Sequence, residues 1–271
     1  MLRIGKYLSA LLMAGISSVS LMSSASAQTS DASTLASIAK SGELRLGWTQ
    51  NVPSSYRDPK TNEVVGYSID MAKEMAKDLG VKLVLVEDSA ATLAAGLQSN
   101  KFDLSIPLAI TLPRLRAVTY SRPFMSTPVS LLMLSKNADK YKSWHDLDNA
   151  NVTISTTLGS NIDLYVTTMF KKAKIDRVRN QSDSLSAVMA GRADAWANSV
   201  ESLEPVTKQR TDVVIIKNGQ FASAELAFPM RQGDFIFAAW INQFLREKAI
   251  NGQLRDLLNT YGLNMDNVLT P

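Results

Sequence analysis

The 271-residue sequence predicts an α/β protein with parallel strands, arranged as two units of similar size. Two observations support this prediction. Strand-like and helix-like apolar segments alternate along the chain, and the alternation starts again near Asn151. Alternation of this kind is typical of parallel sheets, because the helices connect successive strands. Cysteine is absent from the sequence, so both cores must hold without disulfides.

The first 27 residues predict a secretory signal. Arg3 and Lys6 give a basic start, residues 7–22 are mostly apolar, and residues 25–27 read Ala-Ser-Ala. Small residues at these positions are typical of a cleavage site, here after Ala27. The apolar run is interrupted by Gly15 and several serines and is short for a membrane span. We therefore expect a periplasmic protein with the leader removed.

The first half of the chain alternates regularly after a Ser- and Ala-rich stretch. Residues 67–79 place Ile69, Ala72 and Met75 on one helical face, and Gly80 provides a left-handed stop. The expected strands are 43–48, 81–86, 102–106 and 129–134, and the expected helices are 67–79 and 89–97.

The second half repeats this pattern and closes with two amphipathic helices. Gly191 and Gly252 follow helix-like segments and predict their ends. The expected strands are 152–155, 175–178, 193–197, 213–216 and 225–230, and the expected helices are 161–172, 183–190, 200–208, 234–249 and 253–261.

Composition excludes several function classes. The 29 Lys and Arg nearly balance the 25 Asp and Glu, and no basic stripe stands out, so we expect no nucleic-acid partner. Without cysteine there is neither thiol catalysis nor a thiolate metal site. His145 is the single histidine and lies in a polar, turn-like stretch, which argues against a Ser-His-Asp triad. We expect no metal and no cofactor.

Five short stretches follow one another in a recognisable order. They are GYSIDMA at 66–72, TLPR with VTYSRPF at 111–124, GS at 159–160, GRADA at 191–195, and AAWINQFL with GQL at 238–254. Together they resemble the polar amino-acid-binding family of periplasmic solute-binding proteins that serve ABC transporters. The resemblance covers essentially the whole mature chain.

The resemblance implies a type II periplasmic-binding-protein fold, with two lobes, two crossing strands and a ligand cleft between the lobes. Residues 38–126 and 222–271 would form the first lobe, and 127–221 the second. A small carboxylate-bearing solute, an amino acid or a related organic acid, would bind by hinge closure. The expected partner is an ABC permease in the inner membrane, and the expected state is a monomer.

The family pattern puts Arg114 at the carboxylate-binding position. A guanidinium suits this role, because its planar fork meets a carboxylate with two parallel hydrogen bonds. Ser160 begins a helix, where free N–H groups and a hydroxyl would bind the same carboxylate, or where the serine is simply an ordinary cap. Thr111 either orients the loop that carries Arg114 or closes a turn.

Aromatic residues are candidates for the cleft walls. Tyr67 lies where the family often places a ring against the solute, and Trp48 and Tyr56 are further candidates. Burial in the core is the alternative for each. Trp196 and Trp240 lie on apolar faces, and we expect them in the core.

Two positions depart from the family pattern. Ser199, flanked by Asn198, stands where the family has the Asp that pairs with an α-ammonium, and Ala109 replaces a hydroxyl residue. An uncompensated ammonium is costly to bury, so free amino acids would bind weakly and neutral or acylated amines better. Alternatively, Glu201 replaces the missing charge, unless it faces solvent.

Two function classes are compatible with these residues. The first is a non-enzymatic receptor for an ABC transporter. The second is an enzyme similar to the cyclohexadienyl dehydratases, which resemble the same family. An enzyme of that kind needs a general acid in the cleft, and Glu201 and Glu225 are the nearest candidates.

Overall fold

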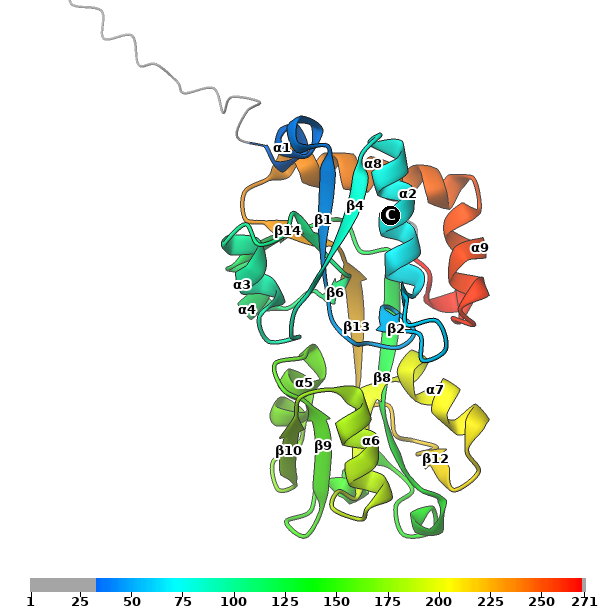
Figure 1. Ribbon diagram of the computed structural model, residues 1–271. Coiled ribbons are helices and arrows are strands. Elements are labelled where there is room, and N and C mark those ends of the chain that lie inside the picture. The colour runs from blue at the N-terminus through cyan, green and yellow to red at the C-terminus, as the bar shows by residue number, and fades with distance from the viewer. Residues whose placement is uncertain (1–32, 270–271) are drawn as a thin grey trace, which may run out of the picture.

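The computed structural model describes residues 33–269 and shows two α/β lobes, one above the other in Figure 1. The expected signal segment lies outside the described residues. No helix within residues 33–269 has both the length and the apolar character needed to cross a membrane.

The first lobe is built on a five-stranded sheet with the order β4-β1-β5-β14-β7. Its first three strands are parallel, and β14 joins them antiparallel through a pair between Met230 and Leu104. The elements of this lobe are α1 (Thr34–Ser41), β1 (Glu43–Trp48), β2 (Tyr56–Arg57), β3 (Val64–Val65), α2 (Tyr67–Asp78), β4 (Lys82–Glu87), α3 (Leu93–Gln98), β5 (Leu104–Ser105), α4 (Leu112–Leu115), β7 (Val118–Tyr120), β14 (Pro229–Arg231), α8 (Phe235–Ile250), α9 (Gln253–Thr260) and the 3₁₀ turn η4 (Met265–Asn267).

The second sheet has the order β10-β9-β11-β8-β13-β6, with β12 paired to β8. Strands β9, β10 and β11 are parallel to one another, whereas β8 is antiparallel to β11 and β13. Its elements and their helices are β6 (Leu108–Ala109), β8 (Met125–Leu134), η2 (Ser135–Asn137), η3 (Trp144–Leu147), β9 (Thr153–Thr157), α5 (Asn161–Met169), β10 (Lys174–Val178), α6 (Gln181–Met189), β11 (Ala195–Ser199), α7 (Val200–Gln209), β12 (Val213–Ile215) and β13 (Ala222–Ala227).

Strands β8 and β13 connect the two lobes (Figure 1). The sequence predicts one strand over 225–230, and this is wrong in one respect. Ala227 pairs with Leu108 in the second sheet, whereas Pro229 pairs with Tyr120 in the first. The chain changes sheets at Phe228, whose fully buried ring stacks on Phe124 at 5.5 Å. The exact lobe boundaries, 38–126 with 222–271 and 127–221, stay a prediction.

Helix starts follow local capping rather than the edges of the apolar pattern. Helix α6 is capped by Asn180, whose side chain accepts a hydrogen bond from the Asp183 N–H, so the helix starts before residue 183. Helix α1 begins inside the Ser- and Ala-rich stretch, because Ser33 caps it and the buried Asp234 carboxylate accepts the Thr34 N–H at 2.6 Å.

Candidate solute-binding site

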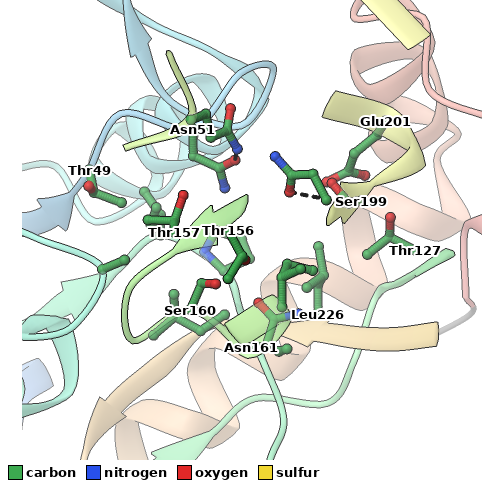
Figure 2. Close-up of a pocket in the computed structure, with 18 of the residues that line it drawn as sticks. Thr49, Asn51, Thr127, Thr156, Thr157, Ser160, Asn161, Ser199, Glu201 and Leu226 are labelled. Carbon is green, nitrogen blue, oxygen red and sulfur yellow. Dashed lines mark hydrogen bonds between the residues drawn. The ribbon is translucent and has the colours of Figure 1, made fainter. Parts of the chain in front are cut away.

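A cavity lies between the two lobes (Figure 2). The space between its walls, including the part open to solvent, is about 790 Å³. Both lobes contribute to its lining, which consists of Thr49, Gln50, Asn51, Tyr67, Ala90, Ile106, Pro107, Leu108, Ala109, Arg114, Thr127, Thr156, Thr157, Ser160, Asn161, Ile162, Arg179, Gln181, Ala197, Asn198, Ser199, Glu201 and Leu226.

Arg114 is held at the junction of the lobes by two backbone carbonyls. Its Nη1 donates to the Ala109 carbonyl and its Nη2 to the Gly159 carbonyl of the opposite lobe, each at 3.2 Å. Burial lowers the pKa of Arg114 from its ordinary value, but a guanidinium keeps its charge in proteins. Two bonds leave other donors of the guanidinium available for a solute.

Thr111 and Ala109 act through Arg114. Thr111 caps the short helix α4, and its hydroxyl accepts the Arg114 N–H at 3.4 Å. Thr111 does not line the central cavity; it lines an adjoining groove with Arg114 and Gly159. The Ala109 carbonyl accepts from Arg114 and, at 3.1 Å, from the Tyr120 hydroxyl, whose pKa burial raises to about 12. Sequence reasoning missed that this backbone oxygen, and not the side chain, holds the guanidinium.

Ser160 both caps helix α5 and lines the cavity. Its hydroxyl accepts the Asp163 N–H at 3.1 Å, which is the ordinary capping role. Next to it, Thr156 is fully buried, and its Oγ1 has no hydrogen-bond partner among residues 33–269. A buried, unsatisfied hydroxyl in a cavity wall is a natural contact for a polar ligand.

The opposite wall carries the residues that depart from the family pattern. Ser199 and Asn198 are buried, and the Asn198 Oδ1 accepts the Ser199 N–H at 2.8 Å. Glu201 lies in the first turn of α7, and its half-buried side chain also lines the cavity. Burial raises the pKa of the Glu201 carboxyl from 4.5 to about 7, although hydrogen bonds with Thr127 and Ser199 oppose the change. Glu225, the other candidate acid, is exposed on β13 and does not line the cavity.

The aromatic candidates divide. Tyr67 lines the cavity, but its ring is almost fully buried, and burial raises the pKa of its hydroxyl well above the ordinary value. Trp48 is not a cavity wall: it is 2% exposed in the first core, with Arg57 over its ring at 5.6 Å. Tyr56 does not line the cavity either.

Trp196 is buried in the second lobe, whereas Trp240 is partly buried and stacks with Phe244.

Sequence reasoning missed the residues by which the lobes meet. The Gln181 Nε2 donates to the Asn51 Oδ1 at 2.6 Å, and the Ser202 Oγ donates to the Val52 carbonyl at 2.7 Å. Both bonds join the second lobe to the 49–55 segment of the first. Arg179 also lines the cavity. Asn51 is in a loop, and Gln181 and Ser202 are single polar residues near helix starts, so no periodic signal could have identified them.

The charge inventory of the cavity is small. Of the described residues that line it, Glu201 is the one acid, and Arg114 and Arg179 are the two bases. Residues 33–269 contain no group of three or more His, Cys, Asp or Glu arranged to hold a metal ion. The cavity is therefore suited to a small polar molecule that carries at least one anionic group.

The profile of the bacterial extracellular solute-binding proteins, family 3, matches residues 44–264. This chain belongs to that family. The match covers both lobes and the cavity between them, and it confirms the family predicted from the five motifs.

Relatives of this family-3 protein include both receptors and an enzyme. A probable amino-acid ABC transporter periplasmic-binding protein of Sinorhizobium fredii is 25% identical, over 88% of this chain and 82% of its own length. The cyclohexadienyl dehydratase of Pseudomonas aeruginosa is 26% identical, over 90% and 91%.

Solved structures confirm the two-lobed fold of this family-3 protein. The crystal structure of an ancestral amino acid-binding protein, described as a precursor of cyclohexadienyl dehydratase, is 32% identical with a TM-score of 0.78. The likeness covers 84% of this chain and 99% of that one.

Proposed function

We propose that this protein is the non-enzymatic, periplasmic receptor of an ABC uptake system, and that it closes around a small carboxylate-bearing solute. Its membership of family 3 and its likeness to an amino-acid ABC transporter binding protein support the proposal. The signal cleaved after Ala27, a monomeric state and delivery to a permease in the inner membrane belong to the same proposal.

The single observation that carries this proposal is the setting of Arg114. The guanidinium lines the cavity, its position is fixed by carbonyls of both lobes, and no acid forms an ion pair with it among residues 33–269. A half-buried cation without a counter-charge favours an anionic ligand. Ser160 at the start of α5 and the unsatisfied Thr156 hydroxyl add donors on the same side.

Native mass spectrometry of the protein purified from its own periplasm tests this function. The expected spectrum shows a chain that begins at Gln28 with one small carboxylate-containing molecule, and the molecule is lost on denaturation. A bound molecule without any anionic group, or a chain that retains residue 1, would contradict the proposal.

A second candidate is a dehydratase that acts on a cyclohexadienyl acid. Two observations favour it: the likeness to the Pseudomonas enzyme, and the Glu201 carboxyl, whose pKa of about 7 suits a general acid at neutral pH. Turnover of prephenate, followed by the appearance of its aromatic product, decides between the candidates. A receptor gives no turnover, whereas a dehydratase gives turnover that Glu201→Gln abolishes.

A further inference from the structure

Glu201 is the acid of the cavity, and no cation neutralises it. The Thr127 and Ser199 side chains lie beside its carboxylate in Figure 2, and within residues 33–269 it has no ion pair with a Lys, Arg or His. We infer that Glu201 binds the ammonium group of the solute, and that the solute is a free L-amino acid with a neutral or acidic side chain. This inference rests on the proposed function and narrows its ligand class.

The elements around Glu201 supply no cation to it. The strands packed against α7 are β8, β11 and β12, and none of the three carries an ionisable residue. From α2, the nearby titratable group is the buried Tyr67 hydroxyl, which is neutral at physiological pH. On α7 itself, Glu204 lies one turn further and pairs with Lys208 at 3.7 Å.

An ammonium beside Glu201 removes the cost of burying its charge. Desolvation disfavours the ionised carboxyl here, and the hydroxyls of Thr127 and Ser199 offset only part of that effect. An opposite charge within hydrogen-bond distance favours the ionised form and satisfies the remaining lone pairs. Glu201 would thereby supply, from the first turn of α7, the charge that the resemblance implies at position 199.

The carboxylate and the ammonium of such a solute would bind on opposite sides of the cavity. Figure 2 shows Ser160 and Glu201 on opposite sides of the cavity, which Thr156 and Thr157 also line. Arg114 contacts Gly159, which precedes Ser160, so the carboxylate-binding groups lie on the Ser160 side. A zwitterion between these sides is neutralised at both ends.

The remaining charge of the cavity selects the side chain. With Arg114 and Glu201 occupied, Arg179 is the one further charged residue among the described lining residues. A lysine or arginine side chain would meet no second acid there. A neutral side chain needs no counter-charge, and an acidic one would be offset by Arg179. Either can also contact Asn51 and Gln181, which close the cavity from the two lobes.

Calorimetry with matched ligands tests the inference. The twenty L-amino acids and L-cystine are first screened by thermal shift on the full mature protein. The best binder is then titrated beside its N-acetyl derivative and its desamino acid. We expect a neutral or acidic amino acid to bind best, and each derivative to bind at least about 30-fold more weakly.

Variants separate this inference from the proposed function. Glu201→Gln keeps the side-chain shape and should weaken the amino acid at least about 30-fold while leaving the desamino acid nearly unchanged. Glu204→Gln, on the exposed part of the same helix, is the matched control and should bind like the wild type.

Each contrary result overturns the inference. It fails if no amino acid stabilises the protein, if lysine or arginine binds best, or if the wild type binds the N-acetyl derivative equally well. The last comparison needs no variant, so a folding defect cannot obscure it. If Glu201→Gln binds normally while Arg114→Ala does not, the inference fails and the proposed function stands; if neither variant affects binding, both fail.

Discussion

The two sides of the cavity differ in how closely their residues follow the family pattern. On the Ser160 side, the residue types follow the family pattern: Arg114 is fixed by carbonyls of both lobes, and Ser160 caps α5. On the Glu201 side the sequence departs from the pattern that the resemblance implies, because Ser199 stands where an Asp is expected and the acid lies two residues further, in α7. One side therefore has its charged residue at the expected position, and the other has its charged residue at a different position.

This difference shows what a binding cavity requires of its sequence. The guanidinium needs a rigid support, since it must meet a planar carboxylate in one geometry. An ammonium is a compact charge that donates hydrogen bonds in several directions. A carboxylate can therefore move along the first turn of a helix and still reach it. Four predictions separate the two sides.

The largest effect is expected for Arg114→Ala. Removing one member of a desolvated charge pair costs about 2–5 kcal/mol of binding free energy, so solute binding should almost disappear by calorimetry. Arg116 is exposed two residues further, and Arg116→Ala is the matched control. Equal losses in the two variants would mean that the carboxylate lies elsewhere.

The second effect concerns stability against pH on the Glu201 side. Burial raises the Glu201 pKa from 4.5 to about 7, so the folded protein retains a proton over this interval that the unfolded chain releases. The contribution of this carboxyl to the unfolding free energy is therefore complete below pH 4.5. It is lost as the pH rises to 7, and the loss is at most about 3 kcal/mol.

Glu201→Gln removes this dependence. Without solute, the unfolding free energy of the wild type should fall between pH 4.5 and 7 relative to that of Glu201→Gln. Urea denaturation of both proteins across this pH range measures the difference. A difference that stays constant with pH would show that the Glu201 carboxyl titrates near its ordinary value.

A smaller effect is expected for Gly159→Ala. Gly159 has φ +72°, and an added Cβ would lie 2.7 Å from the Cβ of Ala91 in the other lobe. Gly191 has φ +69° but open space around it. Both alanine variants should lose about 1 kcal/mol of stability, whereas only Gly159→Ala should also weaken solute binding, by roughly tenfold. Equal affinities would show that the lobes do not close at this contact.

The smallest effect is expected for Thr156→Val. The buried Thr156 hydroxyl has no partner within residues 33–269, so its removal should leave the solute-free protein as stable as before. If the hydroxyl bonds the solute, affinity should fall by about 1 kcal/mol. Loss of stability without loss of affinity would place the hydroxyl in the structure of the lobe and not in the site.

The sequence predicted the alternation of elements and the side of the cavity that follows the family pattern. Periodicity located most strands and helices, because each buries one continuous apolar face. It could not show that Phe228 divides 225–230 between two sheets, since both parts are apolar. Trp48 could not be assigned either, because the face on which a strand residue lies depends on register.

The rest of the site depends on how the lobes meet. Asn51 and Gln181 are 130 residues apart, and no local pattern indicates that their side chains join across the cavity. The supporting role of Ala109 belongs to its carbonyl, which residue type does not reveal. Whether Glu201 faced solvent or the cavity was decided by the rotation of α7 against β8 and β11.

The crystal structure of the protein with its best-binding amino acid tests the central claim most directly. The account predicts the solute carboxylate within hydrogen-bond distance of the Arg114 guanidinium and the ammonium against the Glu201 carboxylate. An ammonium that points away from Glu201, or a carboxylate that does not contact Arg114, would contradict it.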